Sequence, residues 1–378
     1  MARHYRADQA TSNTGSTIAF VVVDEHYDFH TEACAYLAHL RTAGRSPNTE
    51  RVYSSRIALF LNYCEHQRLD WQRLSFDDLA RFLNHVSTQP ITQNGNQPQR
   101  LRFRSNSTAN AIMTTVTEFL RYSSARGWVD DSLVKSLTRP KYLRFRAPSH
   151  DWGEDEQYRT VSERLLKLPE SGSAIQVLSN EDSSKLVNAA TNPRDKFLVC
   201  LMLETGVRIG EALGLRRYDM HLLASSSRLG CPVVGPHIHI RRRQNSNGSL
   251  AKSRYPRAIP ITSATVQLYA LYQHERSLCR PAEDSDFVFV NLYKSPLGEP
   301  TKYSNAKKLF DRMSANAGIV ARPHMLRHSA ATRWVSEGAP RDVVQALLGH
   351  VSPASVEVYL HPTDSEMRAA VERTGTST

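Results

Sequence analysis

Residues 204–215 read ETGVRIGEALGL, and this stretch decides how the second half of the chain folds. Helical periodicity precedes it over residues 195–204, and Gly206 predicts the end of that helix because glycine adopts the left-handed conformation at little cost. Arg208 then lies at the start of the next predicted helix, and Glu211 follows three residues later. The stretch therefore places an arginine at a helix start, where it suits a simple cap of the turn as well as a functional role.

A second segment, PHMLRHSAAT, begins at Pro323 and opens another predicted helix. His324 and Arg327 are three residues apart, so they share a helix face. His324 and His328 are four apart, a spacing found in zinc-binding helices, but such helices carry Glu after the first His and here Met325 takes that place. We therefore interpret His328 as structural and expect no metal at this helix.

A third segment, LLGHVSPASVEVY, spans residues 347–359. His350 precedes Tyr359 by nine residues, with a loop and a predicted helix over residues 355–360 between them. Taken alone, a tyrosine on such a helix is an ordinary amphipathic residue. The joint occurrence of three such segments in order is what favours a functional interpretation.

These segments resemble the signatures of the tyrosine recombinase and phage integrase family: TG-x-R-x-x-E-x-x-x-L, then H-x-L-R-H, then LGH with a tyrosine nine residues later. The resemblance covers residues 178–359, and the SPNTERVYSS helix in the first half is similar to the family's core-binding domain. The AKSR sequence at residues 251–254 and the long connector are similar to transposase-type members. The resemblance implies a site-specific DNA recombinase of integrase or transposase type, with catalytic residues Arg208, Lys252, His324, Arg327, His350 and Tyr359.

Lys252 is assigned through the family's catalytic lysine, which lies in a β-hairpin before an R-x-x-P strand. It stands eight residues before Pro260, as the family's lysine stands before its strand proline. Arg254 and Arg257 lie close by in the same hairpin, and they remain alternative candidates for this role.

The residue types suit phosphodiester cleavage. Two guanidiniums, Arg208 and Arg327, match the charge that develops on two non-bridging oxygens. A tyrosine hydroxyl is a poor nucleophile at neutral pH and needs a base and positive surroundings. We expect His324 to handle its proton, His350 to bind the phosphate, and Glu211 to orient neighbouring cations.

A leaving 5′ oxygen needs a proton, which Lys252 can supply. The resemblance implies that attack leaves a 3′-phosphotyrosine, which conserves the bond energy for religation. Neither ATP nor a metal is then required, so no cofactor is expected.

The composition sets the broad class of protein. The chain has 378 residues, a net charge of +11 and a pI of about 9.5, which favours a polyanionic partner. No apolar run is long enough to span a membrane and the first residues lack the apolar core of a signal peptide, so we expect a cytoplasmic protein. The cysteines are odd in number and form no CxxC pair, which argues against disulfides or a cysteine-based zinc site: Cys34, Cys64, Cys200, Cys231 and Cys279.

The periodicity predicts a mainly α fold with a small antiparallel β-sheet and two domains. The expected divisions are an N-terminal tail at residues 1–24, a helical core-binding domain at 25–145, a linker at 146–177 and a catalytic domain at 178–378. Alternating residues at 236–240 and 257–261 predict the strands of the sheet. His237 and His239 alternate on the first of these strands, and we interpret them as exposed or packed.

Two basic stretches are candidate DNA contacts, with a merely solvated surface as the alternative. One ends the polar loop at residues 89–104, and the other begins the connector as RPKYLRFRAPS at residues 139–149. The residues assigned to DNA binding are Arg100, Arg102, Arg104, Lys141, Arg144 and Arg146.

The expected partner is double-stranded DNA at a recombination site, with self-assembly to a tetramer as the resemblance implies and with accessory DNA-binding proteins as further candidates. Two alternatives stay open: a type IB topoisomerase-like relaxing enzyme, and a DNA-binding regulator that keeps the fold without the chemistry. The sequence does not distinguish integration, excision, resolution and transposition.

Overall fold

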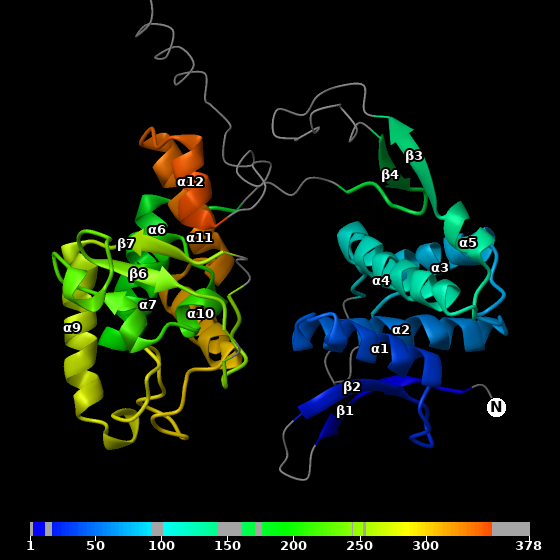
Figure 1. Cartoon of the computed structure of the whole chain (residues 1–378), viewed down its shortest axis with the longest axis horizontal. Coiled ribbons are helices and arrows are strands. Elements are labelled where there is room, and N and C mark those ends of the chain that lie inside the picture. The colour runs from blue at the N-terminus through cyan, green and yellow to red at the C-terminus, as the bar shows by residue number, and fades with distance from the viewer. Residues whose placement is uncertain are drawn as a thin grey trace, which may run out of the picture. The chain divides into compact units, whose positions relative to one another are not determined.

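The computed structural model describes residues 3–11, 17–91, 101–142, 160–170, 176–243, 245–251 and 255–349. The chain separates into two units, Met1–Arg146 with Asp151–Gly172 and Ala147–His150 with Ser173–Thr378. Each unit is mainly helical and carries small antiparallel sheets (Figure 1). The predicted fold class, mainly α with small antiparallel sheets, is therefore confirmed. Within the described ranges, every helix is too short or too polar to cross a bilayer.

The helices of the first unit are α1 (Thr31–Thr42), α2 (Pro47–Gln67), α3 (Phe76–Thr88), α4 (Asn106–Ala125) and α5 (Asp131–Ser136). Local sequence sets where they begin. Ser46 caps α2 by accepting the Thr49 backbone N–H, and Ser75 and Asp78 form a reciprocal capping box at the start of α3. Their apolar faces meet in one core in which Phe60, Phe82 and Phe119 are almost fully buried.

The N-terminal segment is part of this unit. Strands β1 (Arg6–Thr11) and β2 (Thr17–Val23) pair antiparallel and pack on α2. The buried carboxylate of Glu50 on α2 accepts the Phe20 backbone N–H at 2.9 Å and pairs with Arg41 at 3.0 Å. The sequence analysis expected an N-terminal tail at residues 1–24, with a short strand at residues 17–23 as one possibility. The structure has both β1 and β2 here, because Glu50 and the α2 surface give them a place to dock.

A second hairpin closes the first unit. Strand β3 (Thr138–Tyr142) pairs antiparallel with β4 (Thr160–Arg164). Strand β4 lies inside residues 146–177, which the sequence analysis assigned to a linker. The division between the units falls at Gly172 and Ser173, within that same segment.

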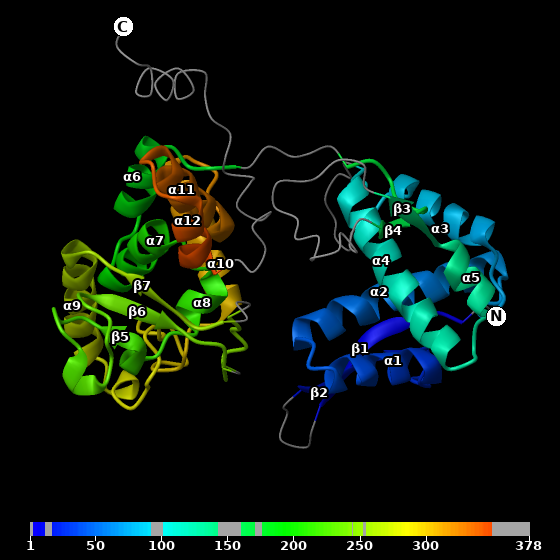
Figure 2. The ribbon, with the colours of Figure 1, turned by 45° about the horizontal axis from the view of Figure 1, so that its top comes forward.

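The second unit is built around α7 (Pro193–Thr205), which packs against α9 (Ser263–Ser277) and α11 (Pro323–Ser336). Phe197, Leu201 and Met202 on α7 are fully buried, as expected of a helix that is apolar on most sides. The other helices of this unit are α6 (Asn180–Asn188), α8 (Ile209–Leu213), α10 (Tyr303–Ala317) and α12 (Arg341–Leu348). Figure 2 shows α7 with the sheet on one side and α11 on another.

A three-stranded antiparallel sheet completes this unit in the order β5 (Met220–His221), β6 (His237–Ile240) and β7 (Arg257–Pro260). Ile238 and Ile240 of the central strand β6 point into the core, so His237 and His239 lie on the opposite face. Strand β7 starts with Arg257, which pairs in register with Ile240. The sheet therefore carries Arg257 on its edge strand and two histidines on its outer face.

Candidate functional site

The site begins where α7 ends. Gly206 takes a left-handed φ of 60° and turns the chain, and Arg208 becomes the N-cap residue of α8. Glu211 accepts a hydrogen bond from the Arg208 backbone N–H at 3.0 Å and one from Arg208 Nη1 at 3.2 Å. The Arg208 side chain keeps 28% of its surface exposed, whereas the Glu211 side chain is fully buried. Glu211 thus fixes a guanidinium that still reaches solvent.

Arg257 on β7 supplies the second cation of this cluster. Its Nη2 donates to Glu211 Oε2 at 2.8 Å, and its Nε donates to the backbone carbonyl of Leu347 at 2.9 Å. Burial by itself raises the pKa of the Glu211 carboxyl, but the charge and hydrogen bond of Arg257 and the Arg208 backbone N–H outweigh burial and hold that pKa below its usual range. Glu211 is therefore a carboxylate at neutral pH.

Arg327 joins segments that are far apart in the sequence. It lies on α11 and is almost fully buried. Its Nη1 donates to the Gly206 carbonyl at 2.8 Å, and its Nη2 donates to the Leu348 carbonyl at 2.8 Å. One guanidinium therefore holds the turn before Arg208 and the end of α12 together.

Two arginine side chains bind backbone carbonyls at the C-terminus of α12. Arg257 binds the Leu347 carbonyl and Arg327 binds the Leu348 carbonyl, which are among the last carbonyls of the helix. Cations at this end also oppose the negative pole of the helix. Gly349 then ends α12 in a left-handed conformation. The two arginines thus fix the point from which the chain continues toward His350.

Two histidines lie on the first turns of α11. The rings of His324 and His328 are 4.2 Å apart in an edge-on arrangement, and His324 is exposed. Partial burial and the neighbouring charges of His324 and Arg327 lower the pKa of His328 to about 4. His328 is therefore neutral at physiological pH and packs beside the exposed His324.

The structure joins three of the predicted residues: Glu211 binds Arg208, and Arg327 binds the Gly206 carbonyl two residues before Arg208. His324 lies on α11 three residues before Arg327. Lys252, His350, Tyr359 and the predicted helix over residues 355–360 lie outside the described residues. The sequence analysis named Arg257 only as an alternative to Lys252. Its position at the start of a strand and its register with β6 are the signals that place it beside Glu211.

The described DNA-binding candidates all lie in the first unit. Arg102 is exposed, Arg104 is partly buried, and Lys141 on β3 is ion-paired with Glu163 on β4 at 2.5 Å. Arg139 pairs with the same carboxylate at 2.9 Å. The contacts with Lys141 and then Arg139 lower the pKa of Glu163. Arg100, Arg144 and Arg146 lie outside the described residues.

The described geometry suits binding of a negatively charged group. Arg208 is held in place yet partly exposed, and Arg327 adds a buried positive charge that is fixed by two carbonyls. Charges fixed before a reaction begins stabilise developing negative charge without reorganisation. The cluster can therefore hold a phosphate, and His324 provides an exposed group that can carry a proton.

Residues 176–366 match the model of the phage integrase family, and residues 34–127 match the model of the phage integrase N-terminal SAM-like domain. Transposase A from transposon Tn554 of Staphylococcus aureus is 26% identical over 354 residues, covering 92% of this chain and 92% of that protein. A tyrosine recombinase of Thermosipho africanus is 25% identical over 341 residues, covering 89% of this chain and 96% of that protein.

Solved structures show the same fold. The integrase of transposon Tn1549, in complex with circular intermediate DNA, aligns with a TM-score of 0.60 at 16% identity and covers 90% of this chain and 99% of that one. The XerH site-specific recombinase, bound to a palindromic difH substrate, aligns with a TM-score of 0.57 at 19% identity and covers 91% of this chain and 86% of that one.

Proposed function

The chain belongs to the phage integrase family of tyrosine recombinases, site-specific enzymes that cleave and rejoin DNA through a tyrosine, and we propose that Tyr359 is the nucleophile here. The sequence analysis predicted this family and its cleavage and rejoining of DNA by a tyrosine, and the comparisons confirm both. In the proposed reaction, the Tyr359 hydroxyl attacks the scissile phosphate and forms a 3′-phosphotyrosine, while the 5′ oxygen leaves with a proton from Lys252. The freed 5′ hydroxyl of a second strand then attacks the phosphotyrosine and releases the enzyme.

One observation carries this proposal: Arg327 binds the carbonyls of Gly206 and Leu348. That single side chain connects the segment of Arg208 with the helix that precedes His350 and Tyr359 in sequence. We assign Arg208 and Arg327 to the two non-bridging oxygens, His324 to the proton of the nucleophile, and His350 to a further hydrogen bond to the phosphate. Arg257 and Glu211 are positioning residues, because they act through Arg208 and α12.

We further propose that the substrate is a double-stranded recombination site in the cytoplasm, and that the chain assembles on it as a tetramer. A recombinase must hold two duplexes to exchange four strands, and the net charge of +11 favours DNA binding. The candidate contacts in the first unit are Arg102, Arg104 and Lys141, together with Arg100, Arg144 and Arg146.

The test is a nicked suicide substrate that loses the 5′ hydroxyl needed for religation. Wild-type protein should become covalently attached at the 3′ side of the break, and Tyr359→Phe should bind the site with close to normal affinity but form no adduct. Peptide mapping of the adduct identifies the nucleophile. An adduct that persists in Tyr359→Phe, or that maps to another residue such as Tyr303, would sink the assignment. DNA binding by wild-type protein with no adduct would instead favour the regulator alternative.

A further inference from the structure

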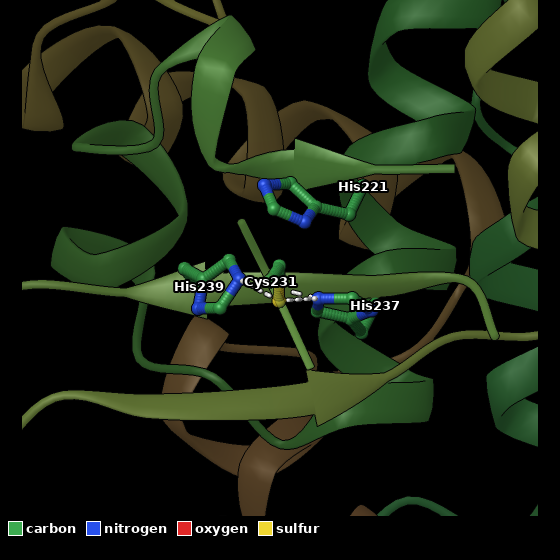
Figure 3. Close-up of side chains that lie close together, drawn as sticks. All are labelled: His221, Cys231, His237 and His239. Carbon is green, nitrogen blue, oxygen red and sulfur yellow. Dashed lines mark hydrogen bonds between the residues drawn. The ribbon is translucent and has the colours of Figure 1, made fainter. Parts of the chain in front are cut away.

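Four potential metal ligands gather on the outer face of the three-stranded sheet. They are His221 on β5, Cys231 in the following loop, and His237 and His239 on β6, and their ligand atoms all lie within 4.8 Å of one another. Figure 3 shows the three rings and the sulfur converging between the two strands. None of the four takes part in the proposed recombination chemistry.

The local fold explains why they meet. His237 and His239 are two residues apart on a strand, so they share a face. The antiparallel register pairs His221 with His237 across β5 and β6. The loop between these strands turns at Gly230, which has a left-handed φ of 72°, and the next residue is Cys231, whose Sγ faces both β6 histidines.

The distances between donor atoms fit those around a shared metal ion. Cys231 Sγ lies 3.3 Å from His237 Nε2 and 3.5 Å from His239 Nε2, and the two Nε2 atoms are 3.2 Å apart. Zinc bonds of about 2.0–2.1 Å to nitrogen and 2.3 Å to sulfur, in a tetrahedron, separate two nitrogens by about 3.4 Å and a nitrogen and a sulfur by about 3.6 Å. Three of the four donors therefore already span one face of such a tetrahedron. The fourth donor, from His221, lies within 4.8 Å of the other three.

Hydrogen bonds satisfy this arrangement only in part. His237 Nδ1 lies 2.7 Å from the Gly235 carbonyl, which only accepts, so the proton is on Nδ1 and Nε2 offers one lone pair. Both Cys231 Sγ and His239 Nε2 face that single lone pair. The His221 Nδ1 atom is buried and lacks a hydrogen-bond partner among the described residues. A metal ion bound here would accept one lone pair from each of these donor atoms.

We propose that His221, Cys231, His237 and His239 bind a zinc ion in a structural site. Imidazole nitrogen with one thiolate is a donor set that zinc prefers, and four protein ligands leave no open position for catalysis. The Gly235 carbonyl holds the His237 ring in the tautomer that a metal needs.

The ion fastens β5 and the loop that follows it to the central strand β6. Strand β6 is hydrogen-bonded to β7, which carries Arg257, the residue that binds Glu211 in the candidate site. The sequence analysis expected no cysteine-based metal site because no CxxC pair occurs. The ligand spacing H-x9-C-x5-H-x-H lacks such a pair, and only the strand register brings its members together.

The experiment uses the full-length protein with metal ions as probes. After extensive dialysis, elemental analysis should find about one zinc per chain. Chelator-treated protein titrated with Co²⁺ should gain the visible bands of a four-coordinate site and a near-ultraviolet sulfur-to-metal band. Adding zinc to this protein should raise the unfolding midpoint by about 5 °C or more at a hundredfold excess over the dissociation constant.

Substitutions assign the ligands. Cys231→Ser should remove the sulfur-to-metal band, and His221→Gln should weaken zinc binding by about tenfold or more. Cys279→Ser is the matched control, since this free cysteine lies in the same unit outside the cluster, and it should leave both properties unchanged. Wild-type protein that binds neither zinc nor Co²⁺ overturns the proposal even if a variant fails to fold. A sulfur-to-metal band that survives in Cys231→Ser, or a site that accepts only copper, overturns it as well.

Discussion

Glu211 on α8 and Arg257 on β7 form a buried ion pair, with 2.8 Å between Glu211 Oε2 and Arg257 Nη2. The same carboxylate binds the Arg208 backbone N–H, and the same arginine binds the Leu347 carbonyl. The pair therefore joins α8, β7 and α12 at the candidate site through side chains that need not touch DNA. Its loss should affect both folding and the placement of Arg208.

Glu211→Gln should lower the free energy of unfolding by about 3 kcal/mol, because it leaves the buried Arg257 charge without its partner. The matched control is Glu181→Gln, which breaks the exposed pair between Glu181 and Lys185 and should change stability by less than about 1 kcal/mol. Chemical denaturation at neutral pH measures both. Equal small losses would show that the buried pair adds no stability.

The same variant tests the ionisation of Glu211. The folded-state pKa is below the ordinary glutamate value of about 4.3, so the carboxylate stabilises the fold fully above that value and progressively less as pH falls through the folded pKa. The stability gap between wild type and Glu211→Gln should therefore shrink when unfolding is measured at about pH 3 instead of pH 7. An unchanged gap at low pH would mean that charge is not its source.

Gly206→Ala should destabilise the second unit by about 2 kcal/mol or more. The φ of 60° is unfavourable for alanine, and a Cβ here would lie 3.1 Å from Trp334 and 3.2 Å from Leu348. Gly318→Ala is the control, since Gly318 ends α10 with a φ of 66° but has open space around its Cβ position. Denaturation should show a smaller loss of about 1 kcal/mol there. Equal losses would mean that packing of Gly206 against α11 and α12 contributes nothing.

Local signals made most helices of this fold predictable. Ser46 with Pro47, and Ser75 with Asp78, mark helix starts within four residues of sequence, and the structure begins α2 and α3 there. Strand β1 gave no such signal, because RADQAT is polar and its position depends on β2 and on Glu50 of α2. Pairing with a distant element is not readable from a short window.

The site was predictable only in part, because some of its residues lie in local motifs and others meet only through long-range pairing. Arg208, Glu211 and Arg327 lie in segments whose spacing is characteristic of one family, so the sequence alone is enough to propose them as site residues. The role of Arg257 depends on strand register, and the meeting of Cys231 with His237 depends on the path of a loop. These are long-range consequences of folding that spacing alone does not encode.

Glu163→Gln should strengthen DNA binding if Lys141 contacts the phosphate backbone. The substitution removes a negative charge and releases Lys141 and Arg139, which are both more than half exposed. The slope of log affinity against log salt should then steepen by about one unit for each added phosphate contact. Lys141→Ala should make that slope shallower by about one.

The control for this measurement is Glu118→Gln, which breaks the pair of Glu118 with Arg121 on α4 and removes the same charge from the first unit. It should change the slope little. If Glu118→Gln and Glu163→Gln behave alike, net charge and not a specific Lys141 contact governs binding, and the solvated-surface alternative holds for this stretch.

Lys252→Ala should slow cleavage of ordinary DNA by about 10²–10⁴-fold, the range typical of a lost general acid. The 5′ oxygen leaves poorly without a proton, whereas a sulfur in the same bridging position leaves readily as a thiolate. Lys252→Ala should therefore cut a 5′-sulfur-bridged substrate at close to the wild-type rate. Single-turnover formation of the covalent adduct on both substrates gives the two rates.

Arg208→Ala is the control, because it removes charge stabilisation from the non-bridging oxygens, and sulfur in the bridging position does not replace that. Its cleavage should remain slow on both substrates. Arg257 is a poor competitor for the acid role, since its guanidinium is already held by Glu211 and by the Leu347 carbonyl. Selective rescue by sulfur in Arg254→Ala or Arg257→Ala, with none in Lys252→Ala, would show that the general acid is one of these arginines and not Lys252. If sulfur does not rescue Lys252→Ala and this variant binds DNA more weakly, Lys252 only contacts a phosphate.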